Sequence, residues 1–188
     1  TVWIGAESGS QRILDAMEKG SRVEDIRAAA DRLHGAGIEV GFFLQFGYPG
    51  ETREDIEATR RLVAECAPDD IGISVSYPLP GTRFYDRVRA ELGAKRNWDD
   101  SNDLAMMYRG PFSTAFYRAL HGVVHQEFRL RARARRPRQT AAMLYHVATL
   151  PWARRRLERL ARKPHEGIGP LEAALSPAQA AIPSEQGS

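Results

Sequence analysis

Residues 1 to about 92 repeat one pattern three times, and this repeat constrains the fold more than any other feature of the sequence. Each copy has a short apolar run, then a turn, then a stretch with the apolar spacing of an amphipathic helix. The expected strands are Val2 to Ala6, Ile38 to Phe46 and Ile71 to Tyr77. Strands that alternate with helices in this way are typical of parallel β/α units. The sequence therefore predicts an α/β fold.

Local signals place the helices between and after these strands. Gly20 is expected to close the first helix as its C-cap. The segment from Ser21 to Glu24 has the pattern of a capping box and predicts the start of the second. Thr52 and Asp55 predict the start of the third helix, which is expected to end at Pro68. A fourth is expected to end near Leu92.

Three parallel β/α units are too few to close a barrel, so their sheet would have open edges. The second strand is almost continuously apolar, as is usual where a sheet is covered on both faces. The chain also opens on an apolar run at Thr1, with no initiator Met and no basic leader. We therefore expect the chain to be a piece of a larger protein, with the missing N-terminal part of that protein as its partner.

The rear of the chain is basic, whereas the front is acidic. Between Arg118 and Lys163 there are 13 Lys and Arg against two acidic residues, a net charge of +11, and the remainder of the chain carries −8. Residues 93–163 are predicted to form a basic helical extension. Residues 164–188 are rich in Pro, Gly, Ala and Ser, which predicts a disordered tail.

Two helices are expected in the basic extension. The first begins near Ser113 and ends at Pro137, and the second runs from about Gln139 to Lys163 with an interruption at Pro151. Three interpretations of their arginines stay open: cover for the barrel, contact with an anionic membrane surface or substrate, and RNA binding. No RNA-binding module is visible, so nucleic acid is the least expected partner.

The sequence offers little for metal or disulfide chemistry. Cys66 is the single cysteine, which excludes an internal disulfide, and it lies on an apolar helical stripe where we expect core packing. His121 and His125 are four residues apart, but Gly122 stands where an HExxH site has its glutamate. We interpret both histidines as surface or packing residues and predict no metal ligand. No apolar run reaches the roughly 20 residues that cross a bilayer, and a cytoplasmic location is expected.

The turn after the first strand carries polar side chains at the edge where parallel β/α proteins bind ligands. The carboxylate of Glu7 is suited to accept hydrogen bonds from both hydroxyls of a ribose. Ser8 and Ser10 lie at a helix start, where hydroxyls and free N–H groups suit a carboxylate. The alternative is that the two serines cap the helix and that Glu7 only favours its dipole.

The other two turns are rich in Gly and Pro. Close backbone approach is permitted between Phe46 and Gly50, so the strand edge there is suited to hydrogen-bond a flat heterocycle. Phe43, Tyr48 and Tyr77 are candidates for stacking surface. An ordinary Pro-Gly turn with core aromatics is the alternative. Thr82, at the end of the third turn, equally suits a helix N-cap.

Taken in this order and spacing, the three turns resemble known motifs. Glu7–Ser10, Phe43–Thr52 and Tyr77–Thr82 resemble the fourth, fifth and sixth strand motifs of the radical S-adenosylmethionine (radical SAM) barrel. The match is closest to the branch that usually carries a cobalamin-binding domain ahead of that barrel. The resemblance implies that residues 1–92 are the last three β/α units of a partial (β/α) TIM-type barrel, followed by an α-helical C-terminal extension.

The resemblance also implies a binding site for SAM. The cofactor-binding residues that it implies are Glu7, Ser8, Ser10, Gln45, Phe46, Gly47, Ser76 and Tyr77. Glu7 and Ser8 would bind the ribose or methionyl part, with Ser10 assisting, and the residues on the second and third strands would flank the adenine. The resemblance does not identify a catalytic residue in this chain.

The family reduces SAM with a [4Fe-4S] cluster and releases a 5′-deoxyadenosyl radical that abstracts hydrogen from the substrate. Three cysteines of a CxxxCxxC loop hold that cluster and are absent here, so we expect them upstream. Cobalamin is a candidate second cofactor, and the expected reactions are methyl transfer or cyclisation at an unactivated carbon of a small-molecule or lipid-like substrate. The alternative is a non-catalytic basic module on a degenerate half-barrel that binds RNA or a membrane surface.

Overall fold

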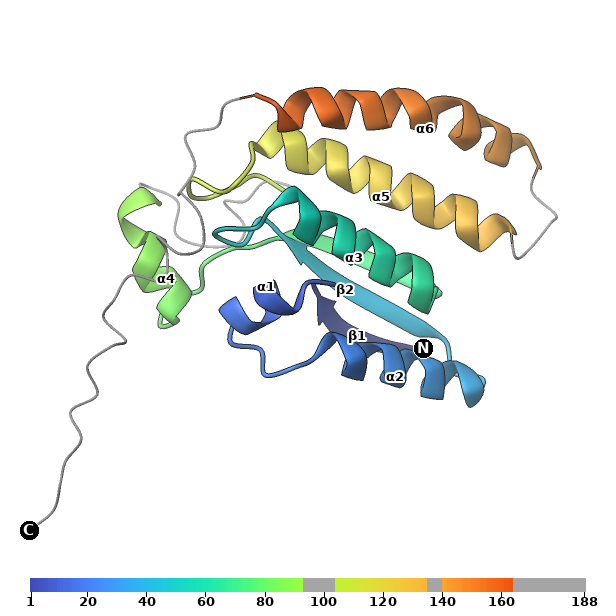
Figure 1. The fold of residues 1–188 in the computed structure, drawn as a ribbon, viewed down its shortest axis with the longest axis horizontal. Coiled ribbons are helices and arrows are strands. Elements are labelled where there is room, and N and C mark those ends of the chain that lie inside the picture. The colour runs from blue at the N-terminus through green and yellow to red at the C-terminus, as the bar shows by residue number, and fades with distance from the viewer. Residues whose placement is uncertain (93–103, 135–139, 164–188) are drawn as a thin grey trace, which may run out of the picture.

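The computed structural model describes residues 1–92, 104–134 and 140–163 (Figure 1). Its elements, in chain order, are β1 (Val2–Glu7), α1 (Gln11–Ala16), α2 (Val23–Gly35), β2 (Val40–Phe46), α3 (Arg53–Cys66), β3 (Asp70–Val75), α4 (Arg83–Val88), the 3-10 helix η1 (Arg89–Glu91), α5 (Thr114–Ala134) and α6 (Thr140–Ala161). Strands and helices alternate through residue 91, as the repeat predicts.

The strands form one parallel sheet in the order β1-β2-β3. Phe43, in the middle strand, pairs with Gly5 on one side and with Gly72 on the other. The register of β1 against β2 shifts between Gly5 and Glu7, which marks a bulge at the carboxyl end of β1. The α/β prediction is confirmed, with three parallel strands in the described part of the chain.

Helices cover one face of this sheet (Figure 1). Alternate strand residues point to that face, so Val40, Phe42 and Leu44 are almost completely buried. The apolar stripes of α2, α3 and α5 supply the other side of the core, as their spacing predicts. Burial of these apolar surfaces is the main stabilising term of the fold.

The opposite face of the sheet is partly exposed in the described part of the chain, so the predicted cover on both faces is found on one face only. Phe43 is 51% exposed there, and its ring stacks on Trp3 at a centroid distance of 4.5 Å. Gly41 leaves room for this pair, because a Cβ at that position would lie 2.5 Å from the Trp3 ring. The two aromatic rings shield each other in place of a second layer.

The capping predictions have two outcomes. Thr52 and Asp55 form the predicted capping box at the start of α3. The capping box at Ser21 is wrong: Arg22 is the N-cap of α2 and makes no side-chain capping bond. The reason is tertiary, since the side chain of Gln11 on α1 accepts the hydrogen bond from Val23 N–H at 3.0 Å and satisfies that helix end.

Helix α1 is also shorter than predicted. It ends at Ala16 with Met17 as its C-cap, so Gly20 is not the C-cap. Glu18 and Gly20 both have positive φ, 56° and 66°, and turn the chain between α1 and α2. The break brings Lys19 to the carboxyl edge of the sheet, where the candidate site lies.

Helices α5 and α6 lie side by side, with α5 against the sheet and α6 outermost (Figure 1). Helix α6 runs unbroken through Pro151, so the predicted interruption is wrong. The helix tolerates Pro151 because the carbonyl that it frees belongs to Val147, which is 51% exposed and therefore accessible to water. The hydrophobic core continues from residues 1–92 into both helices.

A buried carboxylate ties three helices together. Glu127 on α5 accepts hydrogen bonds from Arg60 on α3 and from Arg154 on α6, with nitrogen to oxygen distances of 2.5 Å. Burial raises the pKa of Glu127, but its bonds to the two arginines outweigh burial and leave the pKa lowered. Glu127 is therefore a charged anchor between α3 and the outer helices.

Some predictions fall outside the described residues. They are the connection at 93–103, the end of the helix at Pro137 and the tail at 164–188. Within the described part of the chain, no helix combines the length and the hydropathy that a bilayer span requires.

Candidate functional site

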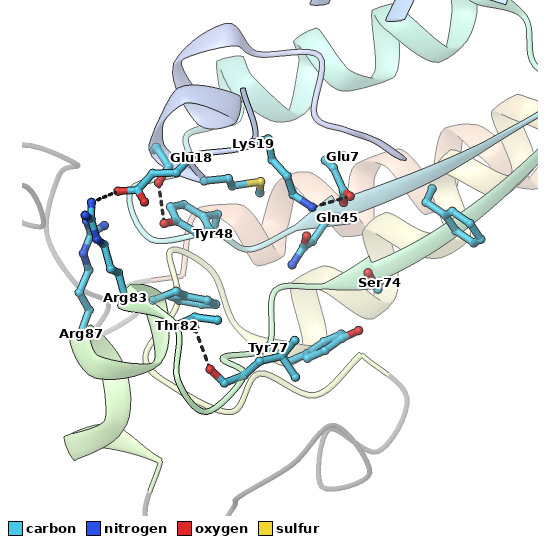
Figure 2. A pocket seen from close by; sticks show the side chains of 15 residues that line it. Glu7, Glu18, Lys19, Gln45, Tyr48, Ser74, Tyr77, Thr82, Arg83 and Arg87 are labelled. Carbon is cyan, nitrogen blue, oxygen red and sulfur yellow. Dashed lines mark hydrogen bonds and ion pairs between the residues drawn. The ribbon is translucent and has the colours of Figure 1, made fainter. Parts of the chain in front are cut away.

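A cavity of about 660 Å³ opens at the carboxyl edge of the three strands. Its walls come from the ends of the strands, from the turn after α1 and from α4 (Figure 2). Polar and aromatic side chains line it, among them Glu7, Phe43, Gln45 and Tyr77. Ligands of parallel β/α proteins bind at this edge, and the cavity is in the size range of small-molecule sites.

Glu7 lies at the bulge that ends β1. Its φ of 54° is in the left-handed region, which is unusual for a residue other than glycine. Its carboxylate is 2.9 Å from the ammonium of Lys19, and its side chain is only 15% exposed (Figure 2). The absence of a side chain on Gly5 leaves room for the carboxylate, since a Cβ there would lie 3.2 Å from Glu7 Oε1. A strained backbone at a cavity is a feature of binding sites.

The neighbouring strands present side chains to the same cavity. Gln45 on β2 is in register with Ser74 on β3, and both line the cavity (Figure 2). Phe43 lies two residues before Gln45 and therefore points to the same face. Tyr77 follows the end of β3. Glu7, Gln45 and Tyr77, three of the residues that the resemblance implies for SAM, therefore lie in one cavity wall, where amide, hydroxyl and carboxylate groups lie beside aromatic rings.

Ser8 and Ser10 lie away from the cavity and contact α3. Ser8 is fully buried, and its hydroxyl is 3.2 Å from that of Thr59. Ser10 donates a hydrogen bond of 2.6 Å to Asp55. Ser10 occupies the N-cap position of α1, as the capping alternative expects, but its side chain makes no capping bond. Both serines hold the turn after β1 against α3.

Phe46, Gly47 and Ser76 are buried below the cavity and do not line it. The carbonyl of Phe46 accepts a hydrogen bond of 2.7 Å from Ser76 N–H, which extends the β2–β3 pairing by one residue. Gly47 has a φ of 84° and donates its N–H to Glu51 at 2.8 Å. These groups shape the strand ends next to the cavity.

Glu51 is a buried carboxyl behind this turn. It accepts hydrogen bonds from Gly47 N–H and from the hydroxyl of Tyr117 on α5. Burial dominates over these bonds and raises the pKa of Glu51 from 4.5 to about 8. Tyr108 donates its hydroxyl to the carbonyl of Gly47. The segment from 104 onward is therefore in direct contact with the turn after β2.

Two sides of the cavity were missed by sequence reasoning. Lys19 comes from the turn after α1, and Arg83 and Arg87 come from α4 (Figure 2). Arg83 pairs with Glu18 at 2.9 Å, while Tyr48 donates its hydroxyl to the carbonyl of Ala16 at 2.7 Å. A lysine beside a glycine in the turn was the one available signal for Lys19. Its approach to Glu7 depends on the early end of α1, which has no local pattern.

The remaining candidate groups are remote from the cavity. Cys66 is buried in the core, as predicted. The rings of His121 and His125 are 4.3 Å apart on α5. Burial and nearby Arg129 lower the pKa of His121. Across the described residues, no group of three His, Cys, Asp or Glu side chains is arranged to hold a metal ion.

Comparison with known proteins gives a match for the segment that builds the first part of this site. Residues 1–63 match the family model described as the radical SAM superfamily. The chain is 34% identical over 100 residues to an uncharacterized methyltransferase of Pyrococcus horikoshii. It is 38% identical over 85 residues to the tRNA-2-methylthio-N(6)-dimethylallyladenosine synthase of Aromatoleum aromaticum.

Each alignment covers only part of this chain and only part of the relative. They cover 52% and 44% of this chain, and 22% and 19% of the two relatives, so the chain matches about a fifth of each relative's length. The matched residues 1–63 include β1, α1, α2, β2 and most of α3, and so include Glu7, Lys19 and Gln45 of the cavity wall. Residues 1–63 are thus similar to part of a radical SAM superfamily domain.

Proposed function

We propose that this chain is part of a radical SAM enzyme and that its cavity binds the nucleoside side of SAM. The observation that carries the proposal is Glu7, which the bulge and the left-handed backbone at the end of β1 turn toward a cavity of about 660 Å³. A carboxylate accepts hydrogen bonds from two adjacent hydroxyls, and a ribose presents such a pair. The family match over residues 1–63 supports the same assignment.

The other cavity residues fit the remaining parts of SAM. Lys19 places an ammonium beside Glu7 and suits the methionyl carboxylate. Phe43 and Tyr77 offer aromatic surface to the adenine, and Gln45 offers an amide to its polar edge. Ser8 and Ser10 take a supporting role in this proposal, since both hold the Glu7 turn against α3.

The residues of this chain do not fit a [4Fe-4S] cluster, which needs three thiolates in this family. Cys66 is the only cysteine of the chain and is buried in the core, where burial raises the pKa of its thiol. We propose that the cluster ligands belong to an N-terminal part of the same protein. When bound there, the cluster would supply the electron that cleaves SAM to a 5′-deoxyadenosyl radical.

The reaction class follows from the names of the relatives. One is named as a methyltransferase and the other as a methylthio-group synthase, so we propose transfer of a one-carbon or methylthio group. Cobalamin-dependent methyl transfer, or cyclisation at an unactivated carbon of a small-molecule or lipid-like substrate, is the finer proposal. It rests on the resemblance of the three turn motifs to the cobalamin-binding branch.

Replacement of Glu7 in the complete polypeptide tests the cavity assignment. Glu7→Gln keeps one acceptor but loses the charge, and Glu7→Ala loses both. We expect Glu7→Ala to weaken SAM binding by about tenfold or more, with Glu7→Gln in between, as measured by calorimetry. Glu24→Gln is the control for a lost carboxylate, because Glu24 is exposed on α2. Unchanged affinity in both Glu7 variants would remove Glu7 from the site and sink the proposal.

A further inference from the structure

The outer face of α6 carries a group of exposed apolar side chains beside a group of cations. The apolar members are Leu144, Tyr145, Val147 and Trp152, and the basic members are Arg155, Arg156, Arg159, Arg162 and Lys163. Leu144 is 69% exposed and Trp152 is 62% exposed. Large apolar side chains that gather on one exposed face mark an interaction surface.

This face is distinct from the side by which α6 packs on the protein. Leu150 and Leu157 are buried in the core, and Arg154 is bound to Glu127. Figure 1 shows α6 as the outermost layer, with α5 between it and the sheet. One side of α6 therefore packs on the rest of the protein, and the other side is exposed.

The charge of the outer face is not balanced locally. Glu158 is the only acidic residue of α6, and it pairs with Arg53 on α3 at 2.5 Å. In the described part of the chain, none of the five cations of the face forms an ion pair with an acidic side chain. A shallow groove of about 530 Å³ runs along the helix between Trp152 and Arg162. An anionic partner complements this face.

We propose that the outer face of α6 docks on an anionic lipid surface. Aliphatic and aromatic side chains next to Arg and Lys are the features of helices that lie in a membrane interface. Trp and Tyr rings are favoured at the level of the headgroups, and cations bind their phosphates. Nucleic acid also attracts the cations, but it offers nothing to the side chains of Leu144 and Val147.

The order of residues along α6 sets the orientation of docking. Leu144, Tyr145 and Val147 lie in the first half of the helix, whereas the cations begin at Arg155 and continue just past the end of α6 at Ala161. The first half therefore inserts among the acyl chains near the headgroups, and the second half rests on the headgroup phosphates. Trp152 lies at the boundary, where its ring reaches both regions.

Co-sedimentation of the chain with lipid vesicles tests this proposal. The probes are vesicles of phosphatidylcholine alone and of phosphatidylcholine mixed with phosphatidylglycerol. We expect binding to the mixed vesicles, about tenfold or more weaker binding to the neutral ones, and further weakening as salt is raised. Binding to both vesicle types with equal affinity, or to neither, would overturn the proposal.

Two sets of substitutions test the two parts of the face. The triple change Arg155→Gln, Arg159→Gln and Arg162→Gln is expected to weaken binding to the mixed vesicles by about tenfold or more. Its matched control removes the same charge from α2 and α3, by Arg22→Gln, Arg32→Gln and Arg61→Gln, and is expected to change binding by less than about twofold. Equal losses in the two triples would show that only net charge matters.

The apolar part is tested by Leu144→Ala with Trp152→Ala. Both side chains are exposed and Ala favours helix, so the fold should persist, with circular dichroism as the check. We expect weaker binding to mixed vesicles by about tenfold. Full binding by this variant would overturn the insertion of α6.

Two other occupants of the face are outcomes of the same experiments. If the chain bound single-stranded or duplex RNA more tightly than vesicles, the face would be assigned to nucleic acid. If the chain formed a dimer and the variant did not, the face would be assigned to a second copy of the chain. Either result would overturn the proposal.

Discussion

The turn after β1 and the helix pair α5–α6 are held to the same helix, α3, in different ways. At the turn, Gly9 lies directly against the α3 main chain, and a Cβ added to it would be 2.7 Å from Thr59 Cα and would clash with the Ala58 carbonyl. On α5, a Cβ added to Gly122 would meet nothing within 4 Å. The cavity edge is therefore set by main-chain contact, which permits little adjustment.

The helix pair instead depends on long charged side chains. Glu127 joins α5 to Arg60 of α3 and to Arg154 of α6, and Arg53 of α3 pairs with Glu158 of α6. Long side chains adjust to small shifts of a helix, whereas two main chains in contact do not. The turn at the cavity edge is therefore held tightly against α3, whereas the outer helices are held to α3 by charged side chains.

The largest effect is expected from Gly9→Ala. The added methyl group has no space against Ala58 and Thr59, so the turn must move away from α3 and lose the hydrogen bond from Gly9 N–H to Thr59 Oγ1. We expect the free energy of unfolding to fall by on the order of 4 kcal/mol in urea denaturation. A loss below about 1 kcal/mol would show that the contact is adjustable.

The next largest effect is expected from Glu127→Ala, which leaves Arg60 buried without its partner on α5. We expect a loss of about 3 kcal/mol in the free energy of unfolding at neutral pH. Glu65→Ala is the control, since the exposed pair of Glu65 with Arg27 should contribute under about 1 kcal/mol. Equal effects of the two substitutions would contradict a buried charge anchor.

The pH dependence of Glu127 gives a second check on that comparison. Its pKa in the folded protein is lowered, so its contribution is present above the pKa of the unfolded chain and is lost as the pH falls through the folded value. The difference between the wild type and Glu127→Ala should therefore shrink in acid. A constant difference would mean that packing, and not charge, is lost in the variant.

Much of the fold could be predicted because its signals are local. The stripe of Ile56, Leu62 and Val63 predicts the buried side of α3, and Thr52 predicts its start, both of which the structure confirms. The errors have other causes. Gln11 on α1 satisfies the start of α2 in place of the predicted capping box, and this contact has no signature in the sequence near α2. Helix α6 continues through Pro151 because the carbonyl that Pro151 frees belongs to the exposed residue Val147.

The candidate site was predictable only in part, for a related reason. Glu7, Gln45 and Tyr77 could be placed because strand ends meet at one edge of a parallel sheet. Ser8 and Ser10 looked equivalent to Glu7 in the sequence, but the bulge turns Glu7 to the cavity and leaves both serines on α3. A bulge changes the face of the sheet to which the next residue points, and no residue type near Glu7 predicts a bulge there.

A smaller effect is expected from Glu51→Gln, which tests the contact between the two regions. The folded pKa of Glu51 is raised from 4.5 to about 8, so the protonated form is favoured. The stability that this form contributes is complete below the unfolded pKa and is lost as the pH rises through about 8. The wild type should therefore lose more stability than Glu51→Gln between about pH 5 and pH 9, as measured by thermal unfolding.

The control for Glu51→Gln is Glu24→Gln on the exposed side of α2. It should follow the wild type across the same range of pH, because an exposed carboxylate is equally hydrated before and after unfolding. If Glu51→Gln also followed the wild type, Glu51 would not be a neutral buried group. The bonds from Gly47 and Tyr117 would then hold it as a carboxylate.

The smallest effect is expected from Gly122→Ala on α5. The position is helical and open, so Ala should raise the free energy of unfolding by about 0.5–1 kcal/mol through a lower entropy of the unfolded chain. Gly20→Ala distinguishes the effect of available space from the effect of backbone conformation. A Cβ at Gly20 would also meet nothing within 4 Å, but the φ of Gly20 is 66°. It should lower stability, because L residues avoid that region. A loss of stability in Gly122→Ala would mean that something covers the exposed side of α5, and the contrast with Gly9 would then fail.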